Sequence, residues 1–225
     1  MMKNSLFQTT TSIRPSSVRL LALMFVAVVM LVNSVDALAA DAKDEALFSL
    51  EPQAMIETVA NRTFDRIKRE QVALKENPAL MDDILRDELM PYIDYRFSAF
   101  KVLGRYARKA KPEELKEYVD LFEEYLVSTY SGAMVNYSDQ TVEFAPSTAA
   151  DERSDLSIRA SIKEQGKPDI DIIFKLRKDR RSQKWLIYDL VAEGISLLSS
   201  KQSEYEPVLR KDGMNGLIEL LKSQT

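Results

Sequence analysis

The chain has 225 residues, 45% of them hydrophobic, and a formal net charge of −4. This length and composition predict one sizeable folded domain, and the acidic balance argues against nucleic-acid binding, which favours basic surfaces. Cysteine and histidine are both absent, which excludes disulfides, Cys–His and Ser–His–Asp catalysis and histidine-based zinc sites.

The first 39 residues predict a secretory signal peptide. Three basic residues precede an apolar run at Leu20–Val32, and an A-x-A cleavage site follows at 37–39. A retained membrane anchor is the alternative, but this run of 13 residues is shorter than the roughly 20 residues that a membrane span needs. We expect cleavage after Ala39. Residues 40–225 then form a single exported domain with a net charge of −6, because three bases and one acid are removed.

Residues 50–135 show helical periodicity. Apolar residues recur at intervals of three and four over about 55–67. Asn77-Pro78 predicts a helix start with proline in the first helical position, and Pro91 ends that helix. A short aromatic helix is expected over 92–106, and a long helix with an aromatic face from Lys111-Pro112 to about Met134.

From about residue 140 to 192 the apolar period changes from 3.6 to 2. This pattern predicts four antiparallel strands at about 142–144, 156–162, 170–176 and 185–191, joined in part by hairpin turns. Two short helices are expected over 195–222. The predicted fold is α+β, with the helical N-terminal half packed on one face of a twisted four-stranded antiparallel sheet.

The strand that begins at Trp185 is apolar on both faces, although antiparallel sheets usually keep one face in water. Strict alternation divides its side chains into Trp185, Ile187 and Val191 on one face, and Leu186, Tyr188 and Leu190 on the other. Ordinary core packing explains such a pattern. An enclosed apolar ligand cavity is the functional alternative.

The charged clusters give weaker signals. Adjacent acids such as Asp82-Asp83 and Glu123-Glu124 do not share a helix face and are read as solvated surface, so no metal site is predicted. The run Lys175–Lys184 has six basic residues around a turn. It is interpreted as a charged hairpin tip, with docking to an acidic partner or to lipid headgroups as the alternative.

Four segments together resemble the MlaC family, the periplasmic phospholipid-binding proteins of the Mla pathway that include the toluene-tolerance Ttg2D proteins. They are PYIDYRFSAFKVLGRYARKA, EYVDLFEEYLVSTYSGAM, WLIYDLVAEGISLLSSKQSEY and LRKDGMNGLIELLK. The resemblance implies an elaborated NTF2-like fold that encloses a lipid pocket. It also implies a monomeric periplasmic carrier with bound phospholipid as cargo and no cofactor, and no enzymatic activity.

The resemblance further implies partners and a role. The partners are an inner-membrane ABC transporter with an MCE domain and an outer-membrane lipoprotein–porin complex, and the role is to maintain outer-membrane lipid asymmetry. We expect the pocket to be lined from the aromatic segment, the long helix and one strand face. The predicted lipid-binding residues are Tyr95, Phe100, Leu103, Phe122, Tyr125, Leu126, Phe174, Tyr188 and Leu190.

The sequence is also compatible with two other functions. A small enzyme on a cone-shaped scaffold would use Tyr188, Asp189 and Glu193, because tyrosine and carboxylic acids can carry acid–base chemistry without histidine. A periplasmic interaction module with a solid core would have no pocket large enough for acyl chains. The enzyme requires an acid–base site and the interaction module requires a solid core, whereas the carrier requires an apolar pocket.

Overall fold

The computed structural model describes residues 44–135, 140–146 and 154–225, so the expected signal segment lies outside the described residues. Residues Leu47–Thr225 form one compact unit, and the fold below is that of this unit. No helix in the described ranges is both long and apolar enough to cross a membrane.

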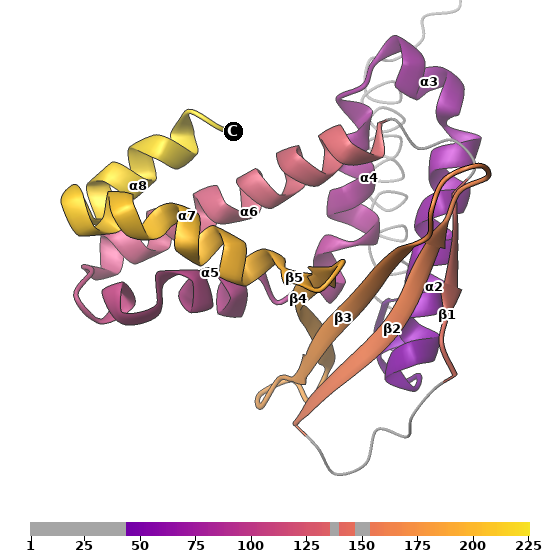
Figure 1. Ribbon diagram of the computed structural model, residues 1–225, viewed down its shortest axis with the longest axis horizontal. Coiled ribbons are helices and arrows are strands. Elements are labelled where there is room, and N and C mark those ends of the chain that lie inside the picture. The colour runs from indigo at the N-terminus through magenta and orange to yellow at the C-terminus, as the bar shows by residue number, and fades with distance from the viewer. Residues whose placement is uncertain (1–43, 136–139, 147–153) are drawn as a thin grey trace, which may run out of the picture. The chain divides into compact units, whose positions relative to one another are not determined.

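Helices make up the first part of this unit, as predicted (Figure 1). The long helix α6 has the predicted bounds. The helical elements before the sheet are α2 (Pro52–Arg69), α3 (Gln71–Glu76), α4 (Leu80–Glu88), the 3-10 turn η1 (Met90–Tyr92), α5 (Tyr95–Leu103), the 3-10 turn η2 (Gly104–Arg108) and α6 (Pro112–Met134).

The start of α4 differs from the prediction. Asn77 donates its N–H to Ala73 and thereby closes the last turn of α3. Its carbonyl then accepts from Leu80, as the carbonyl of Pro78 does from Met81, so these residues form a tight turn before the helix. The helix therefore begins two residues after Pro78.

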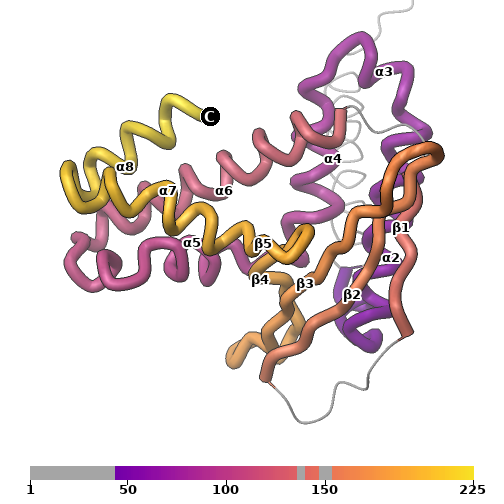
Figure 2. The backbone as a smooth tube through the Cα atoms, in the orientation of Figure 1, coloured from indigo at the N-terminus to yellow at the C-terminus, as the bar shows by residue number. Residues whose placement is uncertain are grey.

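The sheet is an antiparallel meander with strand order β1-β2-β3-β4-β5 (Figure 2). Four strands match the predicted ones, and the fifth consists of two residues that pair with the end of β4. The strands are β1 (Thr141–Phe144), β2 (Asp155–Lys163), β3 (Ile170–Lys178), β4 (Trp185–Ala192) and β5 (Ile195–Ser196). Two helices follow within the predicted range, α7 (Leu197–Lys211) and α8 (Gly213–Lys222).

A β-bulge in β4 breaks its alternation. Lys175 of β3 pairs with Asp189, whereas the next residue, Leu176, pairs with Ile187. Tyr188 is thus the extra residue, and a bulge of this kind shifts the following side chains to the other face. Ile187 and Leu190 consequently lie on the same face of the sheet, and the strict alternation expected for this strand is wrong.

The first half of α2 packs on one face of the sheet, here called the α2 face. Met55, Ile56 and Val59 share a buried cluster with Ile158 and Leu176. The second half of α2 packs elsewhere. Its apolar side chains join α3, α4 and the end of α6 in a separate cluster that contains Phe64, Ile67, Leu74, Met81, Ile84 and Met134.

Polar contacts tie α2 to α4. The Arg66 guanidinium lies 2.9 Å from both Glu70 and Asp87 and 3.3 Å from Glu88. Arg62 forms a further ion pair with Glu88. Arg62 and Glu88 are largely shielded from water, so this network fixes the two helices more strongly than isolated surface pairs would.

The remaining helices form a third cluster beside the β4 edge of the sheet. Figure 1 shows α5, α7, α8 and the first part of α6 together. Their side chains bury a core that includes Tyr118, Phe122 and Leu217. The group is joined to β4 through hydrogen bonds: Asp94 donates its N–H to the carbonyl of Ile187 at 2.8 Å, and the Ser98 hydroxyl donates to the carbonyl of Tyr188 at 2.6 Å.

Replacing Leu176 by alanine tests the contact between the sheet and α2. Leu176 is fully buried, and removing such a side chain typically lowers the free energy of unfolding by about 2–5 kcal/mol. The exposed Val72→Ala substitution is the control and should change it by less than about 0.5 kcal/mol. Urea unfolding measures both, and equal stabilities for the two variants would contradict this packing.

Candidate functional site

An apolar band crosses the α2 face of the sheet and extends beyond the part that α2 covers. Directly paired residues of an antiparallel sheet point to the same side, and so do residues two apart on one strand. The strand register therefore defines the band. Its members are Val142, Phe144, Ala160, Ile162, Ile170, Ile172, Phe174, Leu190, Ala192 and Ile195.

Burial falls along this band. Ala160, Ile172, Ala192 and Ile195 form one row across four strands. Ala160 is 5% exposed and Ile172 7%, Ala192 is half-buried, and Ile195 at the β5 edge is 62% exposed. Ile170, at the start of β3, is 45% exposed. The apolar surface thus continues from the core to solvent at one end of the sheet.

Several members of the band are only half-buried. Val142, Ile162 and Leu190 have intermediate exposure and belong to none of the three buried clusters formed by the described residues. Phe144 and Phe174 stack with their ring centroids 6.2 Å apart at the side of the α2 cluster. A set of partly covered apolar side chains is suited to hold a long apolar ligand.

The opposite face of the sheet contains a hollow of about 490 Å³. Its lining is mixed: Glu143, Arg159 and Asp171 lie there beside apolar residues, which include Ile173, Val191 and the band members Phe144, Ala160 and Ile172. Two of these groups have partners within the sheet: the Ser161 hydroxyl lies 3.1 Å from Asp171, and the Lys163 ammonium lies 3.7 Å from Glu143. Burying acyl chains against such charged groups is costly. The hollow is therefore less suited to an acyl chain than the band, whose side chains are all apolar.

Most of the predicted site residues lie in the helical cluster away from the band. Leu103, Phe122 and Tyr125 are buried in its core, and Tyr95 and Leu126 pack against it. These five residues lie together in one cluster, and none of the predicted strand residues belongs to it. Phe100 does not belong to this cluster, and its side chain is 43% exposed.

The three predicted strand residues divide between two environments. Phe174 and Leu190 are paired neighbours on the α2 face. Tyr188, the bulge residue, instead places its ring edge-on to Phe97 with centroids 5.4 Å apart. Tyr188 and Leu190 were expected to share a face, and the bulge separates them.

The sequence reasoning missed the isoleucines of the band. Ile162, Ile170 and Ile172 were recognised as strand residues, and their alternation was the available signal for a shared face. Ile195 gave no such signal, because β5 has only two residues and follows the Glu193-Gly194 turn, where both residues have positive φ. Cross-strand register, rather than any one strand, assembles the band.

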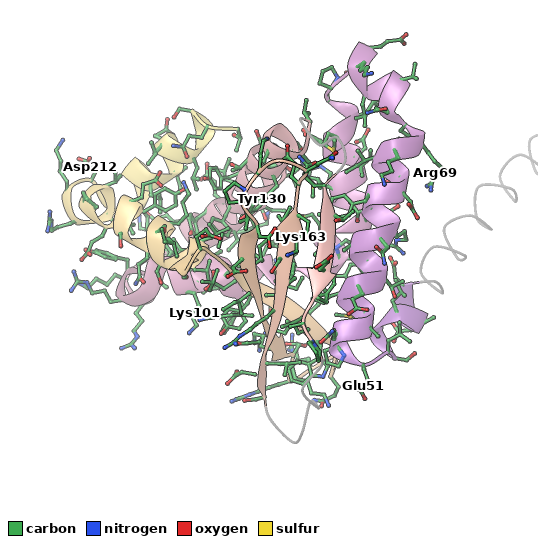
Figure 3. All side chains as sticks on the ribbon, turned by 45° about the vertical axis from the view of Figure 1, so that its right-hand side comes forward. Glu51, Arg69, Lys101, Tyr130, Lys163 and Asp212 are labelled. Atoms are coloured by element: carbon green, nitrogen blue, oxygen red, sulfur yellow. The ribbon has the colours of Figure 1, made fainter. Side chains whose placement is uncertain are left out.

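Three buried or partly buried tyrosines of α6 and α7 stay protonated at physiological pH. Burial, with smaller contributions from Tyr125 and Asp189, raises the pKa of Tyr130 on the C-terminal half of α6 to about 12 (Figure 3). Burial also raises the pKa of Tyr118 and of Tyr205. The Tyr118 hydroxyl donates a hydrogen bond to the carbonyl of Ala99 at 3.2 Å. A phenol whose pKa is raised in this way stays protonated at neutral pH and therefore cannot act as a general base there.

The two carboxylates that an enzyme would need have structural partners. Asp189 is 7% exposed and accepts hydrogen bonds from the Ser196 hydroxyl at 2.7 Å and the Leu198 N–H at 3.1 Å. It thereby holds the start of α7. Glu193 accepts from the N–H of Asp171 at 2.6 Å and so closes the β4–β5 turn on β3. The described residues also contain no cluster of acids suited to a metal ion.

Comparisons with known proteins identify the family of this chain. Residues 57–223 match the family described as MlaC protein. A Haemophilus influenzae protein named intermembrane phospholipid transport system binding protein MlaC is 28% identical over 174 residues, which are 77% of this chain and 81% of that protein. The toluene tolerance protein ttg2D of Pseudomonas putida is 21% identical over 165 residues, 72% of this chain and 74% of that protein.

A solved structure shares the fold. The phospholipid-binding protein from Ralstonia solanacearum, described in complex with a phospholipid, superimposes with a TM-score of 0.70 at 24% sequence identity. The match covers 78% of this chain and 97% of that one. The family match extends over most of the compact unit that carries the apolar band. This chain is therefore a member of the MlaC family.

Proposed function

We propose that this protein is a phospholipid carrier that holds its cargo by the acyl chains against the apolar band. The observation that carries the proposal is the continuous row from buried Ile172 to exposed Ile195. Such a row gives an acyl chain a path between solvent and the interior of the protein. The phospholipid complex of the Ralstonia protein and the name of the Haemophilus relative support the same class of ligand.

The energetics of desorption explain why a carrier is needed. Moving an acyl chain of about 16 carbons from a bilayer into water costs on the order of 12 kcal/mol, at about 0.8 kcal/mol per methylene. Two chains make spontaneous transfer between membranes very slow. A half-buried apolar surface such as Val142, Ile162 and Leu190 lowers this cost by replacing water around the chain.

The cellular role is proposed on the same basis. With the expected cleavage after Ala39, the carrier works in the periplasm, between an outer-membrane lipoprotein–porin complex and an inner-membrane ABC transporter with an MCE domain. In this role it maintains outer-membrane lipid asymmetry. The names of the relatives, which refer to intermembrane transport and toluene tolerance, support such a role. No acid–base residue is required, in accord with the structural partners of Asp189 and Glu193.

Lipid mass spectrometry tests the proposal directly. Protein purified in folded form from the bacterial periplasm should yield glycerophospholipid on organic extraction, in a fixed ratio to protein. After delipidation it should take phospholipid from vesicles again. The proposal is wrong if folded protein carries no phospholipid and takes none up.

A pair of leucine-to-tryptophan substitutions tests where the lipid lies. Leu190 is a half-buried member of the band, so Leu190→Trp should fill the lipid's space and reduce co-purified phospholipid several-fold while the protein stays folded. Leu126 packs against the helical core, so the same change there should lower the free energy of unfolding by about 1–3 kcal/mol and leave lipid loading unchanged.

Thermal unfolding and lipid extraction measure the two effects separately. The assignment to the band fails if Leu126→Trp removes lipid from folded protein and Leu190→Trp does not. A loss of folding in Leu190→Trp would be checked with the smaller change Leu190→Phe.

A further inference from the structure

The segment Tyr95–Lys111 is strongly basic in a chain whose acids outnumber its bases. It covers α5, η2 and the residues up to the start of α6. The segment contains no aspartate or glutamate. Its basic residues are Arg96, Lys101, Arg105, Arg108, Lys109 and Lys111.

All six of these side chains are exposed. The reason is the packing of α5, which buries Ala99, Val102 and Leu103 in the helical cluster. The charged residues of α5 are therefore left on its outer side, where Lys101 is labelled in Figure 3. The segment thus exposes six positive charges in an otherwise acidic protein.

Few of these charges are neutralised within the protein. Arg105 forms an ion pair with Glu206 at 2.9 Å. In the part of the chain that the structure describes, no carboxylate lies within ion-pair distance of Arg96, Lys101 or Arg108. The Lys101 ammonium instead lies 5.5 Å from the centroid of the Phe97 ring. The positive potential of this surface is therefore available to an external anion.

An exposed aromatic residue lies among these charges. Phe100 is 43% exposed and is the only aromatic residue classed as exposed in the described ranges. It follows Arg96 by one helical turn and precedes Lys101 directly. Leaving a phenylalanine in water is unfavourable, and aromatic side chains flanked by lysine and arginine are typical of helices that lie at a membrane interface.

We propose that this basic surface, Arg96, Phe100, Lys101, Arg105, Arg108 and Lys109, docks reversibly on an anionic phospholipid bilayer. The basic side chains contact the headgroups, and the Phe100 ring enters the boundary between headgroups and acyl chains. Charge and the exposed ring together favour a bilayer, because an acidic protein surface would explain the charges alone. The proposal goes beyond cargo binding and does not depend on it.

Vesicle flotation of the purified protein tests the docking. Vesicles of equal parts phosphatidylcholine and phosphatidylglycerol should bind the protein at low salt, vesicles of phosphatidylcholine alone should not, and high salt should release it. Because each basic residue near an anionic surface contributes about fivefold to the partition coefficient, Arg108→Gln with Lys109→Gln should lower it roughly 30-fold. Phe100→Ala should weaken binding and keep its salt dependence.

The matched control removes two charges elsewhere. Lys68 and Arg69 are exposed at the end of α2, so Lys68→Gln with Arg69→Gln changes the net charge equally. This control should bind the vesicles as the unmodified protein does. Equal losses in the two double variants, or no vesicle binding by the unmodified protein, would overturn the proposal. Capture of an acidic protein by this surface without vesicle binding would also overturn it.

Discussion

The fold depends on a mismatch between an apolar sheet face and the helix that packs on it. The first half of α2 packs on the sheet through Met55, Ile56 and Val59, whereas the apolar side chains of its second half join α3, α4 and the end of α6. The apolar residues of β2, β3 and β4 continue past this contact. In a structural protein such surface would be covered by further core residues. Here we propose that a lipid chain occupies it.

The bulge at Tyr188 allows β4 to serve two surfaces at once. Before and after it, Ile187 and Leu190 face α2, whereas Asp189 and Val191 lie on the other side, where Asp189 holds the start of α7. The carbonyls of Ile187 and Tyr188 accept hydrogen bonds from Asp94 and Ser98. One strand thereby connects the helical cluster to the sheet. Its two apolar faces, visible in the sequence, both pack on protein, and one of them also contributes Leu190 to the band.

Periodicity predicted the elements well because it reports local geometry. The bounds of α6 and four of the strands follow from repeats of 3.6 and 2 in the apolar residues. The same repeats cannot say which neighbour covers a buried side chain. Tyr125 and Leu126 lie on an apolar helix face whether that face meets other helices or a ligand, and the structure places them with helices. Leu190 and Phe174 are paired neighbours because their strands are adjacent, and their contact with lipid stays a prediction. The bulge and the two-residue β5 depend on pairing between strands and leave no periodic signal.

The most direct test of the account is to locate the bound acyl chain. A phospholipid with a photoreactive group near the end of one chain would be loaded into the protein, crosslinked, and mapped by peptide mass spectrometry. The account predicts attachment within β2, β3 and β4 at members of the apolar band such as Ile162, Phe174 and Leu190. Attachment confined to the helical cluster around Phe122 and Tyr125, or to the polar face around Arg159 and Asp171, would contradict it.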